Sequence, residues 1–218
     1  MTDVTLTLAG ETVSLLPERA LYWHRRSTLI VADAHWGKAA AFRASSVAIP
    51  GEMTDDDLAR LSAALTRTQP EHIVYLGDLL HAKAGRSPRT FAAVEAWRAR
   101  YSHIEMTLVR GNHDRGAGDP PDDWNIACAD APVIDPPFAF QHFPAGVAGC
   151  YALAGHLHPG AILSGGGHQN LKLPCFWFSR QIGVLPAFGS FTGTSPIQPQ
   201  RGDRIYVVAD DEVIGVGG

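Results

Sequence analysis

Aspartates and histidines in short clusters are the residues of this sequence best suited to chemistry. The 218-residue chain contains 10 histidines, a high number, and neutral imidazole is the commonest metal-binding side chain in proteins. Alone, each cluster would more often be a turn or a hydrogen-bonded core histidine, but their order and context point to a shared site. The clusters are, in chain order, Asp33-x-His35, Gly77-Asp78, Gly111-Asn112-His113-Asp114, a lone His142 and Gly155-His156-x-His158.

Each cluster follows a stretch that predicts a β-strand. Three continuous apolar, β-prone runs, Ser27–Ala32, His72–Leu76 and Ile104–Val109, are typical of buried strands. Between them, Met53–Thr68 and Pro88–Arg100 carry apolar residues at helical spacing and predict two helices. Alternating strands and helices indicate a parallel sheet, and open α/β sheets bind ligands at the carboxyl ends of their strands. We therefore expect the first three clusters to meet at one edge of this sheet.

The rest of the chain predicts further β-structure. Alternating stretches at Val4–Leu8, Thr12–Leu16 and Ala20–His24 indicate an opening β-meander. After Pro120 the sequence consists of short β-prone stretches separated by glycine and proline. This pattern indicates a second, mainly antiparallel sheet packed on the first. The length of the chain favours one α/β domain spanning residues 1–218. The predicted strands of the second sheet are Pro137–His142, Tyr151–Ala154, Ala161–Ser164, Leu171–Phe178, Ile182–Leu185 and Ile205–Ala209.

Composition limits the classes of function. A net charge of −4 gives no global electrostatic preference for nucleic acid. The 3 cysteines form no C-x-x-C pair, so reduced thiols are expected. No apolar run reaches the roughly 18 residues of a membrane span. The N-terminus also lacks the pattern of a signal peptide, so we expect a cytoplasmic location.

The five clusters resemble the motif blocks of the calcineurin-like metallophosphoesterase superfamily, which run D-x-H, G-D, G-N-H-[D/E], H and G-H-x-H in the same order. The match extends from about Val31 to His158, and the combination of G-N-H-D with G-H-L-H is highly specific. The resemblance implies an α/β/β/α sandwich of two packed mixed sheets flanked by helices. It also implies a binuclear metal centre that hydrolyses phosphate esters.

The resemblance further implies which side chains hold the two ions. Two nearby cations repel each other, so a carboxylate must lie between them, and Asp78 matches the bridging residue of the superfamily. A ligand set of nitrogen and oxygen without thiolate favours Mn²⁺, Fe²⁺, Co²⁺ or Zn²⁺, and similarity to bacterial members favours Mn²⁺. Side chains two residues apart share a face of a strand, so each H-x-H or D-x-H pair should project together if the extended conformation continues. The remaining implied ligands are Asp33, His35 and His158 for the first ion, and Asn112, His142 and His156 for the second.

Two residues have implied catalytic roles instead of ligand roles. His113 matches the superfamily histidine that meets the phosphate and protonates the leaving oxygen. Asp114 is expected to hold that imidazole in the required tautomer. The implied reaction is in-line attack of a metal-bridging hydroxide on phosphorus. His81, just beyond Asp78, could hydrogen-bond to a ligand or substrate, or be structural.

A closer resemblance covers nearly the whole chain. The segments Asp33-Ala34-His35-Trp36-Gly37-Lys38, Phe42-Arg43, Ile49-Pro50-Gly51 and Leu185–Gly193 are similar to a bacterial subfamily, the ligase-associated DNA damage response endonucleases. Its members are named for genomic association with an ATP-dependent DNA ligase, a helicase and another nuclease. The resemblance therefore implies DNA as the substrate and a functional association with ligase and helicase. Gln141 and Phe143, on either side of His142, depart from the expected small and acidic residues.

Basic residues in or near the metal-bearing loops are a second pointer to a phosphodiester substrate. They could form a rim that grips a phosphate backbone, or they could be solvated surface charges. No basic stripe interleaved with aromatic residues is evident, so binding by base stacking has little support in the sequence. Alternatives on the same metal core are a phosphodiesterase of small nucleotides, a phosphomonoesterase or protein phosphatase, and a non-catalytic scaffold. The rim candidates are Lys38, Arg43, Lys83, Arg86, Arg89 and Arg115.

Overall fold

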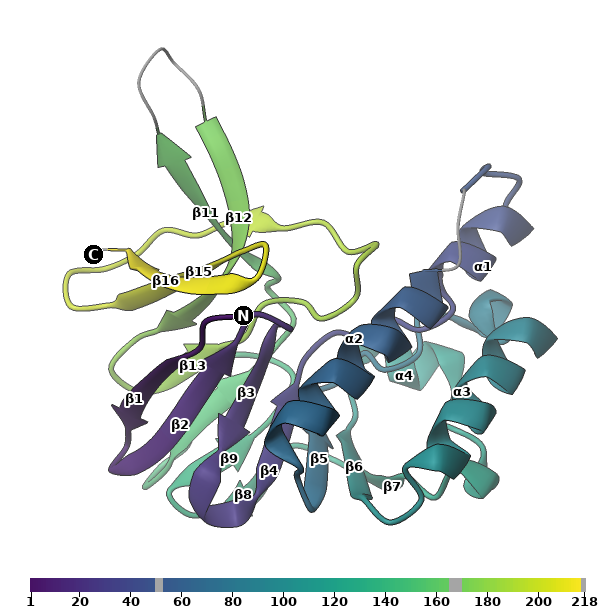
Figure 1. Ribbon diagram of the computed structural model, residues 1–218, viewed down its shortest axis with the longest axis horizontal. Coiled ribbons are helices and arrows are strands. Elements are labelled where there is room, and N and C mark those ends of the chain that lie inside the picture. The colour runs from purple at the N-terminus through teal and green to yellow at the C-terminus, as the bar shows by residue number, and fades with distance from the viewer. Residues whose placement is uncertain (50–52, 165–169, 217–218) are drawn as a thin grey trace.

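The computed structural model describes residues 1–49, 53–164 and 170–216. Pro50, Gly51 and the predicted loop at Gly165–Gly167 lie outside these residues. Two β-sheets pack face to face, and a helical layer covers the first of them (Figure 1). The predicted pair of packed sheets in an α/β protein is confirmed.

The first sheet combines the predicted meander with the predicted parallel strands. Its first four strands pair antiparallel and its last four pair parallel. Two of the parallel strands, Thr28–Val31 and His72–Tyr75, are almost entirely buried because their apolar runs are covered on both faces. In spatial order the strands are β1 (Val4–Leu8), β2 (Glu11–Leu16), β3 (Ala20–Trp23), β4 (Thr28–Val31), β5 (His72–Tyr75), β6 (Glu105–Val109) and β7 (Ala127–Ala129).

Four α-helices connect or follow these strands: α1 (Lys38–Ala44), α2 (Met53–Thr68), α3 (Pro88–Arg100) and α4 (Asn112–Ala117). Helices α2 and α3 have the predicted bounds. They cover the outer face of the first sheet (Figure 1), where Leu61 and Val94 pack in one cluster with Ile73 of β5 and Leu108 of β6. Burying each of these side chains stabilises the fold by about 1.5–3 kcal/mol.

The second sheet is mixed. Strands β9, β10 and β13 run parallel at its centre, and most of the remaining pairs are antiparallel, as the sequence predicted. The β11–β12 hairpin projects away from the body of the molecule (Figure 1). The strands are β8 (Val133–Asp135), β9 (Phe138–Phe140), β10 (Tyr151–Ala154), β11 (Pro159–Ser164), β12 (Asn170–Phe178), β13 (Ile182–Val184), β14 (Ser195–Pro196), β15 (Arg204–Ala209) and β16 (Glu212–Val216).

The interior between the sheets is a second apolar cluster, in which Ile30 and Val74 of the first sheet meet Phe140, Leu153 and Phe176 of the second. The superfamily resemblance implied helices on both outer faces. In the described part of the chain, every α-helix precedes Gly118, so the second sheet has no helical layer there. The reason is local: the chain after residue 127 consists of short strands and turns without apolar residues at helical spacing. No helix of the described residues is both long and apolar enough to cross a membrane.

Candidate metal centre

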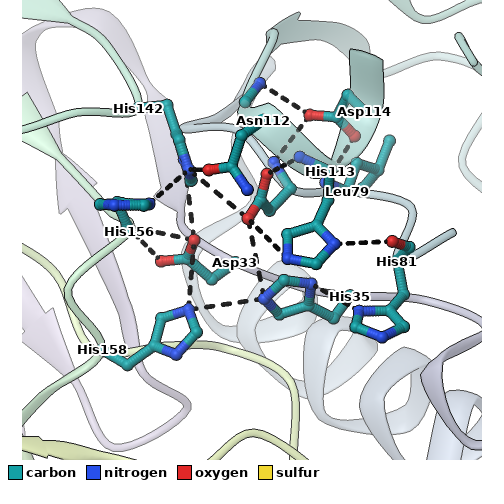
Figure 2. Close-up of polar contacts among 12 residues, drawn as sticks. Asp33, His35, Leu79, His81, Asn112, His113, Asp114, His142, His156 and His158 are labelled. Atoms are coloured by element: carbon teal, nitrogen blue, oxygen red, sulfur yellow. Dashed lines mark hydrogen bonds and ion pairs between the residues drawn. The ribbon is translucent and has the colours of Figure 1, made fainter. Parts of the chain in front are cut away.

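All seven predicted ligands meet where strands of the two sheets end. Asp33 and Asp78 follow β4 and β5, and Asn112 opens α4 after β6. His142 follows β9 in the second sheet, while His156 and His158 follow β10. Figure 2 shows the side chains of Asp33, His35, His142, His156 and His158 turned toward one another. Packing of the two sheets therefore forms the site, because each sheet supplies part of the donor set.

The first group of donors is Asp33, His35 and His158, whose ligating atoms all lie within 4.8 Å of one another. The Nε2 atom of His158 is 3.5 Å from an Asp33 carboxylate oxygen and 3.4 Å from Nε2 of His35. Asp33 is held in place because both of its oxygens accept the backbone N–H of His156, at 2.9 and 3.1 Å. This is the trio predicted around the first ion.

The second group is centred on His142. Its Nε2 atom lies 2.9 Å from Oδ1 of Asn112 and 3.1 Å from Nδ1 of His156. The other ring nitrogen, Nδ1, is 2.9 Å from the carbonyl oxygen of Leu76, which can only accept. Nδ1 therefore carries the proton, and Nε2 presents its lone pair to the site, which is the arrangement that metal-binding histidines require.

Asp78 lies between the two groups. Its Oδ2 atom is 3.4 Å from Nε2 of His142 on one side and 3.9 Å from Nε2 of His35 on the other. Its Oδ1 accepts the backbone N–H of His113 at 2.9 Å, which fixes the orientation of the carboxylate. The position suits a bridging ligand, and the assignment of each ligand stays a prediction.

Five of the seven predicted ligands, Asp33, His35, Asp78, His156 and His158, adopt left-handed backbone conformations, with φ between 48° and 69°. The condition under which the D-x-H and H-x-H pairs were expected to project together, a continued extended strand, is therefore not met. The members of both pairs still reach one site, where His158 lies beside His35 and His156 lies beside His142. The left-handed conformation costs roughly 1–2 kcal/mol for each non-glycine residue, and such strain concentrates at functional sites.

Glycine is required beside these ligands because there is no space for a larger residue. A Cβ atom on Gly111 would lie 2.3 Å from Oδ1 of Asp78, and one on Gly155 would lie 2.6 Å from Oδ2 of Asp33. The close approach is to the ligand side chains themselves.

Burial controls the protonation of the site. Burial, reinforced by the positive charge of Lys38 and neighbouring histidines, lowers the pKa of His35 to about 2. Burial also lowers the pKa of His156, and the adjacent His142 adds to the effect. These imidazoles are therefore neutral at physiological pH, the form that binds metal. Burial raises the pKa of the Asp78 carboxyl, which is the direction a nearby cation would reverse.

The donor set fits two divalent ions. Two buried carboxylates, four imidazoles and one amide oxygen converge, and the glycine positions leave room only for these side chains. Oxygen and nitrogen donors without thiolate suit first-row divalent cations. Asp33, His35 and His158 would hold one ion, Asn112, His142 and His156 the other, and Asp78 would contact both.

His113 lies beside this centre and is held by its neighbours. Its Nδ1 is 2.8 Å from the carbonyl oxygen of His81, so Nδ1 carries the proton and Nε2 faces Asp78 Oδ2 at 4.0 Å. The ring also stacks on that of His81, with centroids 4.8 Å apart, and His81 in turn stacks on Phe42. His81 thus positions His113 through both its backbone and its ring.

The predicted role of Asp114 as partner of the His113 ring is wrong. The buried carboxylate of Asp114 accepts the backbone N–H groups of Gly111, Asp78, Leu79 and Leu80, at 2.7–3.2 Å. It therefore organises the loop that carries Asp78 (Figure 2). The motif explains the difference, because Asp114 is the third residue of α4 and its side chain reaches back to the start of that helix.

The predicted basic rim is only partly available. Arg86 is a structural residue: its Nη1 donates to the carbonyl oxygens of Ala117, Gly118 and Asp119, and its guanidinium lies 4.9 Å from the centre of the Phe91 ring. These carbonyls engage only Nη1, so the role of Arg86 as a phosphate contact, through its other guanidinium N–H groups, stays a prediction.

The other rim candidates differ in the contacts that their side chains make with the rest of the protein. The half-buried Lys38 lies close enough to interact electrostatically with Asp33 and Asp78. Arg89 faces Asp55 at 3.8 Å, and Arg43 donates to the carbonyl of Ile49 at 3.4 Å. Arg115, on α4, is exposed. Lys83 is also exposed, on the short 3₁₀ helix Lys83–Gly85.

A loop that supports Asp33 was not predicted as part of the site. Phe188 and Gly189 donate their backbone N–H groups to the carbonyls of Ala32 and Asp33, at 2.8 and 3.1 Å. The loop is anchored by Asp57 of α2, whose carboxylate accepts the N–H of Ser190 at 2.9 Å. Two sequence signals were available for this loop: the similarity of Leu185–Gly193 to the subfamily, and an aspartate on the buried face of a predicted helix.

Comparison with known proteins supports the geometry. A family model described as calcineurin-like phosphoesterase matches residues 27–179. A search of curated protein sequences finds no match.

The solved structures that match include one similar over nearly the whole chain and a more distant one. The crystal structure of Pseudomonas putida nuclease MPE is 40% identical over 99% of this chain and 100% of that chain, with a TM-score of 0.87. Yfce, a phosphoesterase from E. coli, is 14% identical over 87% of this chain and 97% of that chain, with a TM-score of 0.42. With a family model matched over most of its length and all five motif blocks in one site, the chain belongs to the calcineurin-like phosphoesterase family and is a metal-dependent phosphoester hydrolase.

Proposed function

We propose that the protein is a binuclear phosphodiesterase that cleaves DNA, with Mn²⁺ as its metal. The observation that carries this proposal is the convergence of six other donors around Asp78 in a chain 40% identical to a nuclease. A functional association with DNA ligase and helicase is part of the same proposal and rests on the subfamily resemblance.

The ions, when bound, would supply Lewis-acid chemistry: they lower the pKa of water and neutralise charge on the phosphoryl oxygens. The protein's own residues position the reactants. Asp114 and the Asp33 contacts hold the two carboxylates rigidly, so that little reorganisation is needed during reaction. His113, with its Nδ1–H held by the His81 carbonyl, presents Nε2 to the site; in the doubly protonated imidazolium form it donates the Nε2 proton to the leaving oxygen and returns to the neutral Nδ1–H tautomer.

Lys38, Arg43, Arg86, Arg89 and Arg115 remain candidates for contacts with the phosphate backbone. A phosphodiesterase of small nucleotides is the second candidate function. It is favoured by the binding of Arg86 Nη1 to backbone carbonyls, which leaves fewer N–H groups of the basic rim for a long substrate to contact.

Turnover of bis-p-nitrophenyl phosphate and p-nitrophenyl phosphate with added Mn²⁺ tests the reaction class. We expect the diester to be hydrolysed much faster than the monoester. DNA and a dinucleotide then separate the two candidate functions: cleavage of DNA with a higher kcat/KM supports the first, and cleavage of the dinucleotide alone supports the second. Preference for the monoester would refute both.

A further inference from the structure

An apolar cavity borders the metal centre on the side of the second sheet. It has a volume of about 340 Å³, and its walls include His156, Leu157, Trp177, Pro196, Ile197 and Gln198. Because His156 is both a wall of this cavity and a predicted ligand, a group attached to a phosphate at the metal centre would lie next to the cavity. The volume is at the small end of the range for ligand sites, about 300–1,000 Å³.

The walls combine an aromatic ring, aliphatic side chains and one amide. Trp177 is fixed because its Nε1 donates to Asp203 at 2.7 Å. Leu157, between two predicted ligands, is 37% exposed. The side chain of Gln198 is exposed, so its amide is accessible at the edge of the cavity. A flat heteroaromatic group with a polar edge matches this combination.

Phe143 places an exposed aromatic ring beside the same predicted ligand. Its side chain is 50% exposed, and its ring centroid lies 4.4 Å from that of His156 and 4.9 Å from that of His142. An exposed aromatic side chain costs free energy of hydration, and packing on two predicted ligands gives it a fixed position without covering it. Stacking on exposed aromatic rings is the usual way in which proteins hold unpaired nucleobases.

We propose that this cavity and the ring of Phe143 form a subsite for a nucleobase adjacent to the scissile phosphate. The inference rests on the proposed phosphodiesterase function and names how the substrate is recognised: by the base and apolar contact, in addition to any contact with the phosphate backbone. It differs from the expectation from sequence, in which base stacking had little support.

Two p-nitrophenyl diesters test the subsite, one of thymidine 5′-phosphate and one of methyl phosphate. Both release p-nitrophenolate at the same metal centre, and only the first carries a nucleobase. We expect wild type to have a higher kcat/KM for the thymidine ester, mainly through KM. Phe143→Ala and Gln198→Ala should each reduce the ratio of the two kcat/KM values, and Phe143→Ala by roughly fivefold to a hundredfold, as for the loss of one stacked base.

The ratio removes any effect of Phe143→Ala on its neighbours His142 and His156, because both substrates depend equally on the metal centre. Leu171→Ala is the matched control, since Leu171 is 57% exposed on the projecting β11–β12 hairpin. It should leave the ratio unchanged. Equal kcat/KM for the two esters in wild type, or equal ratios in Phe143→Ala and Leu171→Ala, would overturn the subsite while leaving the phosphodiesterase intact.

Loss of the proposed function would look different, since neither ester would then be hydrolysed. In that case, calorimetric titration with thymidine 5′-monophosphate still decides the question. Weaker binding to Phe143→Ala than to Leu171→Ala supports the subsite. Equal binding to both variants refutes it.

Discussion

The two walls of the metal centre differ in how many of their side chains are already bound by other groups of the protein. The wall from the first sheet and its helices is tied internally: Asp114 binds four backbone N–H groups, Arg86 binds three carbonyls, and His113 is held by His81. The wall from the second sheet leaves Phe143 half exposed and Leu157 accessible beside the ligands. One wall is therefore built to keep reactive groups rigid, while the other has surface free for the organic part of a substrate.

Removing the carboxylate between the walls should have the largest effect. Asp78→Asn keeps the shape of the side chain but deletes the charge that lies between His35 and His142. A charge pair 4 Å apart at an effective dielectric near 20 is worth about 4 kcal/mol, so we expect at least about a thousandfold loss of turnover.

Elemental analysis should show that Asp78→Asn retains fewer than two ions per chain. Asp211→Asn, at an exposed position in the turn between β15 and β16, is the control and should retain wild-type metal and activity. An active Asp78→Asn protein with two tightly bound ions would refute the bridging assignment.

Removing the proposed acid from the rigid wall should have the next largest effect. His113→Ala should keep both ions yet lose about two to four orders of magnitude in rate on DNA. The loss should shrink for p-nitrophenyl esters, because p-nitrophenolate leaves without protonation. His81→Ala is the informative companion: it retains the backbone carbonyl that holds His113 and removes only the stacked ring, so its loss should be smaller. Equal losses on good and poor leaving groups would mean that His113 binds the phosphoryl oxygens instead.

The contrast between the walls also separates what the sequence could predict from what it could not. Strands, the two long helices and the meeting of the ligands follow from apolar periodicity and from the position of each cluster after a strand. The hydrogen-bond partner of Asp114 could not be predicted from the sequence. A carboxylate at the third position of a helix can contact either a neighbouring histidine ring or the backbone at the start of that helix. The engagement of Arg86 depends on carbonyls more than 30 residues away, and no local pattern contains that information.

The exposure of the Phe143 side chain could not be predicted from the sequence either. The sequence showed an unexpected residue after His142, but not whether its ring points inward or lies on the surface of the ligands. Similarly, the left-handed conformations of Asp33, His35 and Asp78 contradict the strand propensity of the residues before them. Such conformations arise where tertiary contacts override local preference, which is common at functional sites.

Acid should weaken the metal-free protein because the centre holds histidines in neutral form. An unfolded histidine has a pKa near 6.5, whereas burial lowers the pKa of His35 to about 2 in the fold. Below pH 6.5 the unfolded chain therefore binds a proton that the folded chain does not, and stability falls as the pH falls. The expected slope from His35 is about 1.4 kcal/mol per pH unit.

Urea unfolding of chelator-treated protein from pH 7 to pH 5 measures this slope. The His35→Asn substitution should flatten this slope. The control is His103→Gln, which changes an exposed histidine in the loop after α3 and should leave the slope unchanged. A wild-type slope that His35→Asn leaves unchanged would place the acid sensitivity elsewhere in the molecule.

The smallest expected effects are those of substituting two arginines on the first wall: Arg86, which donates to backbone carbonyls, and Arg115, which is exposed. Arg86→Ala deletes a donor to three carbonyls and a ring contact, so it should lower the free energy of unfolding by about 1–3 kcal/mol. Arg115→Ala removes an exposed side chain and should change stability by no more than about 0.5 kcal/mol.

If Arg115 contacts the phosphate backbone, its loss should raise KM for DNA and reduce the salt dependence of binding, with a slope lower by about 1. Hydrolysis of bis-p-nitrophenyl phosphate should not change in Arg115→Ala, because the small diester does not extend to α4's exposed face. Denaturant unfolding and DNA cleavage across a salt series, made on both variants, therefore test whether the charge available to DNA lies at Arg115 and not at Arg86. Arg86→Ala with wild-type stability but weakened DNA binding would reverse the two roles.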